Sequence, residues 1–178
     1  MIGEKDSIVF DLDGTLIDVA EKYYKTYSFL LNRENHEVLS KDQYWKLKRE
    51  KKSELDILMQ TNAEQMIASY AENRKKIFET EKFIKYDTLF ADTNNVLSEL
   101  VNYYNLYIVS LRHNKMALMR ELKELDLVQY FSDVLSGENV PGEGHQVKVE
   151  IIEKKEIKNI NFIIGDMPTD IKTGKIYE

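Results

Sequence analysis

Ile8-Val-Phe-Asp-Leu-Asp-Gly-Thr-Leu-Ile-Asp18 is the most informative stretch of the chain. Its apolar beginning predicts a strand over residues 7–10, which ends in two carboxylates one residue apart and a Gly-Thr turn. Alternate residues of a strand share a face, so Asp11 and Asp13 are expected to leave the strand tip in similar directions. Such a pair can divide the work of nucleophile or metal ligand and proton shuttle. The simpler alternative is an acidic turn, in which Asp11 caps a helix or Asp13 fills a turn position.

The second half of the chain alternates between strands and helices. Continuous apolar runs predict strands over 106–110, 133–136 and 160–165, and helical periodicity lies between them. This alternation indicates right-handed crossovers and a parallel α/β sheet of the Rossmann-like kind.

An all-helical block separates the first strand from this second half. One helix begins near Val19, another begins at a capping box over 40–43, and a long one is expected from Thr61, with only a short apolar turn over 55–59 between them. No clear strand occurs in this block. We therefore expect a core domain made of residues 1–17 and 87–178, with a helical unit inserted at residues 18–86.

The composition limits the possible function classes. The chain has 178 residues, a net charge of −6 and no cysteine. The acidic balance argues against nucleic acid as a partner, and the lack of cysteine excludes disulfides and thiolate chemistry. No segment is apolar and long enough to span a membrane, and the first residues have no secretory signal, so a cytoplasmic protein is expected.

Residues with useful chemistry follow each of the expected strands in turn. Asp11 and Asp13 follow the first, Ser110 ends the second, Lys148 begins the helix after the third, and Gly165-Asp-Met-Pro-Thr-Asp170 follows the fourth. Taken singly, Ser110 has the simple alternative of a helix cap, Lys148 that of a surface lysine and Asp166 that of a turn residue. Because parallel strands present their carboxyl ends at one sheet edge, the ordered set predicts a single site.

This ordered set resembles the four motifs of the haloacid dehalogenase (HAD) superfamily, with Asp11-Leu-Asp-Gly-Thr15 as the first. The resemblance covers nearly the whole chain. It implies a Rossmann-like sheet, commonly ordered 3-2-1-4-5, with the active site at its carboxyl edge. It also implies that the inserted helices are a cap of the phosphoglycolate-phosphatase-like and phosphomutase-like type.

The resemblance also implies roles for the acidic residues. Asp11 would attack phosphorus and form an aspartyl-phosphate, while Asp13 would protonate the leaving oxygen and then deprotonate water. The presence of Asp13 points to phosphoester chemistry rather than dehalogenation. The implied cofactor is Mg²⁺, held by the Asp11 carboxylate, the Asp13 main-chain carbonyl and the Asp166 carboxylate.

Further residues would hold the substrate phosphate. The resemblance implies that Lys148 neutralises the nucleophile and the phosphate, with Lys154 and Lys155 as nearby competitors. Asp170 would orient Lys148 or a metal-bound water. Ser110 would donate a hydrogen bond to a phosphoryl oxygen, and Leu111 would offer its backbone N–H. For the next residue two interpretations stay open, since Arg112 can reach the substrate or pair with a surface acid.

The favoured function is a Mg²⁺-dependent phosphatase that acts on a small phosphorylated metabolite. A phosphomutase with the same residues is one alternative, and a catalytically weak phosphate-binding or regulatory module is the other. The sequence ends at Glu178, soon after Asp170, so the sheet is expected to have the order 3-2-1-4 with the fifth strand missing. Self-association at the uncovered sheet edge is a further expectation.

Overall fold

The computed structural model describes residues 5–138, 140, 142 and 144–178. Residues 1–4 of the expected core domain lie outside this range. The chain forms two compact units, one made of residues 1–18 and 88–178 and the other of residues 19–87. These divisions fall one residue after the expected boundaries. No helix among the described residues is long and apolar enough to cross a membrane.

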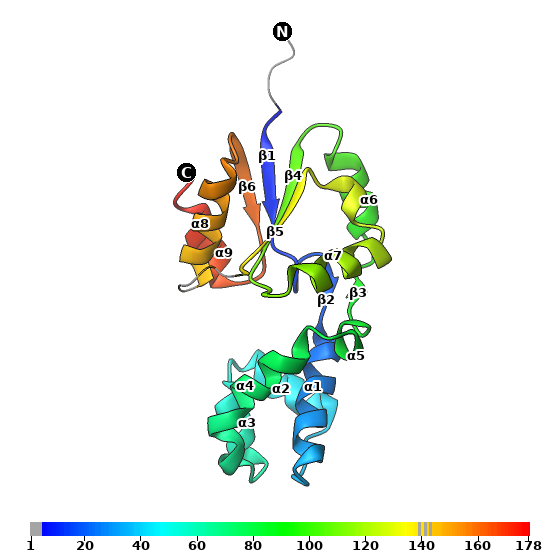
Figure 1. Cartoon of the computed structure of the whole chain (residues 1–178), viewed down its shortest axis with the longest axis vertical. Coiled ribbons are helices and arrows are strands. Elements are labelled where there is room, and N and C mark those ends of the chain that lie inside the picture. The colour runs from blue at the N-terminus through cyan, green and yellow to red at the C-terminus, as the bar shows by residue number, and fades with distance from the viewer. Residues whose placement is uncertain (1–4, 139, 141, 143) are drawn as a thin grey trace. The chain divides into compact units, whose positions relative to one another are not determined.

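The first unit is built on a parallel sheet with the strand order β5-β4-β1-β6 (Figure 1). Its strands are β1 (Ser7–Phe10), β4 (Asn105–Ser110), β5 (Asp133–Ser136) and β6 (Ile160–Ile164). Numbered along the chain, this is the expected order 3-2-1-4, so the predicted fold class is confirmed. Phe10, the last residue of the central strand β1, lies beside Ile164, the last residue of β6, and beside Ile108, two residues before the end of β4. The three strands therefore finish at the same edge of the sheet.

Helices lie on both sides of this sheet. They are α6 (Thr93–Leu100), α7 (Lys115–Glu124), α8 (Gly144–Lys155) and α9 (Pro168–Gly174), with a short 3₁₀ turn η2 (Val128–Tyr130). In Figure 1, α8 and α9 lie together on the side of β6, and α6 and α7 lie together on the other side. One apolar cluster joins the strand residues Val9 and Val109 to Val147, Ile151 and Ile152 of α8. Burial of these side chains fixes α8, and with it Lys148, against the sheet.

The regular secondary structure of the second unit is all helical. It contains α1 (Ala20–Arg33), α2 (Lys41–Arg49), α3 (Glu54–Gln60), η1 (Glu64–Met66), α4 (Ile67–Phe78) and α5 (Glu81–Ile84). The predicted capping box at the start of α2 is present. Two local expectations were wrong. Residues 55–59 belong to α3 rather than to a turn, and the helix expected from Thr61 begins at Ile67, because Thr61 ends α3.

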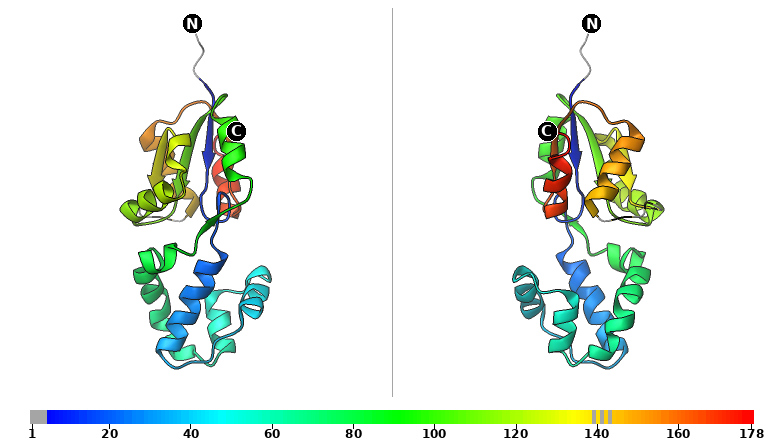
Figure 2. Two further views of the ribbon diagram at one scale, coloured as in Figure 1. Left: turned by 90° about the vertical axis from the view of Figure 1, so that its right-hand side faces the viewer. Right: turned by 90° about the vertical axis from the view of Figure 1, so that its left-hand side faces the viewer.

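Helix α1 lies between α2 and α4 (Figure 2), and its apolar stripe forms the core of the helical unit. Tyr27 of α1 stacks on Tyr44 of α2, with 4.7 Å between ring centroids. A buried ion pair joins the beginning and the end of the unit, because Lys22 Nζ lies 2.5 Å from Asp87 Oδ2. Its ammonium also lies 4.6 Å from the centre of the Phe78 ring, so the charge is paired and shielded from water.

The chain leaves and re-enters the first unit along two short strands that the sequence did not predict. Strand β2 (Ile17–Asp18) pairs antiparallel with β3 (Thr88–Leu89). The Thr93 hydroxyl donates a hydrogen bond to the Leu16 carbonyl over 2.9 Å, which adds a contact beside this pair. The segment by which the chain leaves the first unit therefore lies beside the segment by which it returns.

Candidate active site

Asp11 stands at the carboxyl end of the central strand and is held from both sides. Its backbone N–H donates to the Ile164 carbonyl over 2.8 Å, which continues the pairing of β1 with β6 beyond the strand. Its carboxylate oxygen Oδ1 accepts a hydrogen bond of 2.7 Å from Lys148 Nζ. The Asp11 side chain keeps 11% of its surface exposed, so the carboxylate is held in place without being fully buried.

Lys148 bridges two carboxylates. Besides Asp11, its ammonium donates to Asp170 Oδ1, and both Lys148 and Asp170 are buried. Asp170 is in turn fixed by the backbone N–H of Met167, which donates to Oδ2 over 3.0 Å at the beginning of α9. A β-carbon on Gly165 would lie 2.1 Å from Cγ of Asp170, so only glycine at this position leaves room for the carboxylate. The structure thus brings Asp170 and Lys148 together as expected. The role of Asp170 in orienting Lys148 or a metal-bound water stays a prediction.

Asp166 lies close to the turn that follows Asp13. Gly14 has φ +82, and a β-carbon there would lie 2.5 Å from Asp166 Oδ2. The glycine therefore allows both a left-handed turn and the approach of a carboxylate. Carboxylate oxygens of Asp11, Asp166 and Asp170 all lie within 4.8 Å of one another. Both Asp170 oxygens already accept hydrogen bonds, so Asp11 and Asp166 are the better candidates for metal ligands.

The acids at this edge are electrostatically coupled. Burial raises the pKa of Asp11 to about 6, although Lys148 lowers it, and the negative charges of Asp170 and Asp13 act in the same direction as burial. Burial also raises the pKa of Asp166 above its ordinary value, and Asp170 and Asp13 add to this. Several acids that share one site in this way favour a bound cation, which relieves their mutual repulsion.

Asp13 faces a buried arginine. Arg112 follows β4 in the loop before α7, and its Nε and Nη2 donate to the two oxygens of Asp13 over 3.0 and 2.6 Å. Its Nη1 donates to Glu121 of α7. Burial lowers the pKa of the Arg112 guanidinium, but Asp13 and Glu121 outweigh this and raise it above its ordinary value. Of the two interpretations of Arg112, the structure shows pairing with acids, of which Glu121 is buried and Asp13 partly buried. Contact with a substrate stays a prediction.

Ser110 and Leu111 complete the expected set. Ser110 is buried at the end of β4, and its hydroxyl oxygen accepts a hydrogen bond of 3.3 Å from the Arg112 backbone N–H. Leu111 is partly buried directly after it. The use of the Ser110 hydroxyl and the Leu111 N–H for a phosphoryl group stays a prediction. The competing lysines lie elsewhere, since Lys154 pairs with Glu150 and Lys155 with Asp133.

The structural roles of three residues of this arrangement were not identified from the sequence. Gly14 and Gly165 are needed for close approaches of Asp166 and Asp170, which become visible only when the loops are folded. Glu121 had a detectable signal, because it stands between Leu118 and Leu122 at an inward-facing helical position. A carboxylate at such a position requires a partner, but the sequence does not say which one.

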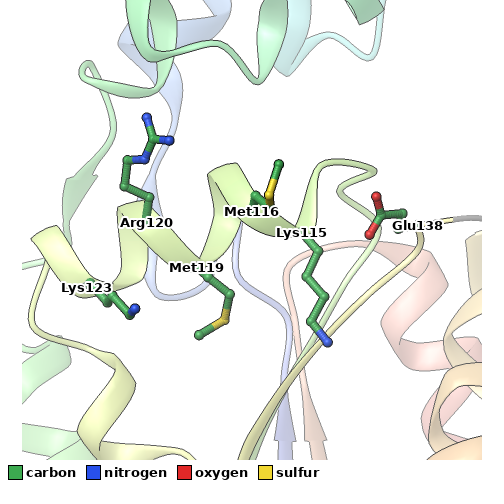
Figure 3. A pocket seen from close by; sticks show the side chains of 6 residues that line it. All are labelled: Lys115, Met116, Met119, Arg120, Lys123 and Glu138. Carbon is green, nitrogen blue, oxygen red and sulfur yellow. The ribbon is translucent and has the colours of Figure 1, made fainter.

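A surface hollow of the same unit lies apart from the carboxylates. Figure 3 shows the side chains that line it, which come from α7 and the loop after β5: Lys115, Met116, Met119, Arg120, Lys123 and Glu138. Met116 is 81% exposed. The hollow shares no residue with the Asp11 cluster, so the chemical groups of the sequence motifs gather at the sheet edge and not here.

The amino-acid sequence matches one protein family over nearly its whole length. The family described as haloacid dehalogenase-like hydrolase matches residues 8–177, which include every residue of the candidate site. Among curated protein sequences, no relative matches the chain.

Solved structures share the fold at low sequence identity. A haloacid dehalogenase-like family hydrolase from Streptococcus pneumoniae is 19% identical, with a TM-score of 0.75 over 97% of this chain and 80% of that one. YfnB from Bacillus subtilis, solved bound to magnesium, is 17% identical, with a TM-score of 0.64 over 98% of this chain and 86% of its own. A protein described as a predicted phosphatase from Clostridium acetobutylicum is 20% identical, with a TM-score of 0.67 over 95% of this chain and 79% of that chain.

Proposed function

Because the chain belongs to the haloacid dehalogenase-like hydrolase family, we propose that it is a Mg²⁺-dependent phosphatase of small phosphomonoesters. The observation that carries this proposal is the Asp11 carboxylate, fixed by Lys148 at the sheet edge with Asp13 two residues away. One carboxylate at this place can act as nucleophile while the other moves protons. A phosphate-binding site without turnover would need neither Asp13 nor the hydrogen bonds by which Arg112 holds it.

The reaction would proceed in two balanced steps. Asp11 attacks phosphorus, the bond between phosphorus and the leaving oxygen breaks, and Asp13 gives that oxygen a proton. Asp13 then takes a proton from water, whose oxygen attacks the aspartyl-phosphate, so that inorganic phosphate leaves and Asp11 is regenerated. Lys148 offsets negative charge on Asp11 and on the phosphoryl group throughout. Ser110 and the Leu111 N–H would donate hydrogen bonds to phosphoryl oxygens.

The oxygen donors present suit a hard divalent cation. We expect the Asp11 and Asp166 carboxylates and the Asp13 main-chain carbonyl to hold Mg²⁺, with waters and a substrate oxygen completing the coordination. The proximity of three carboxylates supports this, as does the magnesium that YfnB binds. When bound, the cation supplies Lewis-acid polarisation of the phosphoryl oxygen and offsets the repulsion between the acids and a phosphate dianion.

The test is phosphate release from a panel of phosphomonoesters with and without Mg²⁺. We expect turnover that requires the metal and is lost in Asp11→Asn. The matched control is Asp126→Asn, because Asp126 is exposed and has φ 53, a conformation that asparagine tolerates well. Metal-independent turnover, or turnover unaffected by Asp11→Asn, would contradict the mechanism.

The same experiment separates the alternatives. Turnover that needs a bisphosphate activator would indicate a phosphomutase, and phosphate binding without turnover would indicate a binding or regulatory module. The substrate is expected to be a small phosphorylated metabolite. The expectations that nucleic acid is not a partner and that the protein is cytoplasmic stay predictions.

A further inference from the structure

The environment of Asp13 contains a second carboxylate that the proposed reaction does not use. Arg112 lies between Asp13 and Glu121, and the exposed fractions are 4% for the side chains of Arg112 and Glu121 and 25% for that of Asp13. The guanidinium is therefore inside the protein, whereas the carboxylate that it holds reaches the surface. This gradient places the arginine behind Asp13 and not in front of it.

The contact between Arg112 and Asp13 fixes an orientation as well as a distance. Two different nitrogens of the guanidinium, Nε and Nη2, donate to the two oxygens of one carboxylate. Such a pair is planar, so the carboxylate of Asp13 cannot rotate about its last bond without breaking a charge-assisted hydrogen bond. A lysine in this place would supply the charge but not the plane.

Glu121 determines where the guanidinium lies. It is a buried residue of α7, and it accepts hydrogen bonds from Nη1 and, over 3.4 Å, from Nη2 of Arg112. Because the flanking residues Leu118 and Leu122 are buried in the core, Glu121 is fixed by the packing of the helix. The orientation of Asp13 is thereby linked to a rigid element of the fold.

The backbone of the same arginine supports the neighbouring phosphate-binding position. The Arg112 N–H donates to Ser110 Oγ. This bond uses the hydroxyl as an acceptor, so its hydrogen remains available for a phosphoryl oxygen. Arg112 thus contacts both Asp13, the expected proton donor, and Ser110, the expected phosphate contact.

We infer that Arg112, held by Glu121, is a positioning residue that orients Asp13 for proton transfer and acts through Asp13 instead of touching the substrate. The inference rests on the phosphatase function proposed above. It assigns Glu121, a residue of the core, to the support of catalysis. It also explains why this helix carries a buried carboxylate, which stability alone does not require.

The test uses leaving groups that differ in their need for a proton. The leaving oxygen of p-nitrophenyl phosphate is stable without protonation, whereas that of phenyl phosphate depends on an acid. The variants are Arg112→Lys, which keeps the charge but loses the planar contact, and Arg112→Met with Glu121→Met, which removes the two buried charges together. Arg33→Lys, at an exposed position in the helical unit, is the matched control.

We expect kcat/KM for phenyl phosphate to fall at least about tenfold further than kcat/KM for p-nitrophenyl phosphate in both variants. When the paired substitution is added to Asp13→Asn, it should cause no further loss, since the residue through which it acts is gone. Equal losses for the two substrates, or an additional loss in the Asp13→Asn background, would overturn the inference. Circular dichroism and thermal melting establish that each variant is folded.

The outcome is distinct from a failure of the phosphatase proposal. If the unmodified protein shows no Mg²⁺-dependent turnover that Asp11→Asn abolishes, the proposed function itself is wrong. If that turnover is present and the leaving-group dependence is unchanged in the variants, only the role of Arg112 and Glu121 is wrong.

Discussion

Asp166 lies so close to Gly14 that a β-carbon on residue 14 would come within 2.5 Å of its Oδ2. The turn after Asp11 and Asp13 and the loop that carries Asp166 therefore lie against each other without a side chain between them. The φ angle of +82 at Gly14 adds a conformational requirement to this steric one.

We therefore expect Gly14→Ala to displace Asp166 and weaken Mg²⁺ binding, and to destabilise the fold by about 1–2 kcal/mol through the left-handed backbone. Calorimetric titration with Mg²⁺ and thermal melting measure the two effects. Gly174→Ala is the control, because a β-carbon there lies 3.9 Å from its nearest neighbour, Cβ of Ile163. Equal Mg²⁺ affinity in the Gly14 variant and the control would contradict the expectation.

The raised pKa of Asp11 predicts a pH dependence of metal binding. Its ordinary value is 3.8, and burial raises it to about 6. Mg²⁺ binds the carboxylate, so protons compete with the metal as the pH falls through about 6, and affinity is restored as the pH rises above that value. Isothermal titration calorimetry between about pH 5 and pH 7 should show weaker binding at the acidic end, together with proton release. An affinity that is constant over this range would argue against Asp11 as a ligand.

Lys148 contributes to stability as well as to the site, since it separates two carboxylates. In Lys148→Met, Asp11 and Asp170 lose their common cation inside the protein. We expect activity to be lost and the free energy of unfolding at neutral pH to fall by about 3 kcal/mol. Acidification should restore part of this loss, because protonation of Asp11 removes the uncompensated charge. Lys155→Met, which removes an exposed ion pair with Asp133, should change stability far less, and equal losses would contradict the expectation.

The open edge of the sheet predicts self-association. Among the described residues, β6 pairs only with β1, and Phe162 on this strand and Ile171 on α9 are 52% and 63% exposed. An unpaired strand edge with apolar neighbours favours pairing with a second copy. Sedimentation velocity should show a concentration-dependent dimer that Phe162→Lys weakens and Met116→Lys, on the distant hollow, does not. A monomer at every concentration would contradict this prediction.

Much of the core unit was predictable because its signals are local. The apolar runs that end at Phe10 and Ser110 are continuous, and the chemical residues follow directly after them, so the strands and the candidate site could be expected together. The strand order was expected only from the resemblance to the superfamily. The helical unit was less predictable in detail. Ser53 and Asp56 form a capping box that starts α3, a signal that the short apolar run after it obscured.

The hydrogen-bond partners of two side chains, Thr61 and Arg112, could not be read from the sequence. Thr61 resembles a helix start, but its hydroxyl donates to the carbonyls of Ile57 and Leu58, so it ends α3 instead. The partner of Arg112 was likewise left open, because an arginine in a loop has the same local sequence whether it faces a substrate or a buried acid. Only packing of α7 against the sheet selects Glu121 as that partner.

The paired strands β2 and β3 have a consequence for how such a chain can diversify. Asp18 lies opposite Thr88 in this pair, and Lys22 and Asp87 join the two ends of the segment between them. The two ends of the 19–87 segment therefore lie next to each other. A different insertion could be joined at the same two points without moving Asp11 or Lys148. Replacement of this segment by another helical insertion would then be expected to leave the fold of the core unit, and the arrangement of Asp11 and Lys148 within it, unchanged.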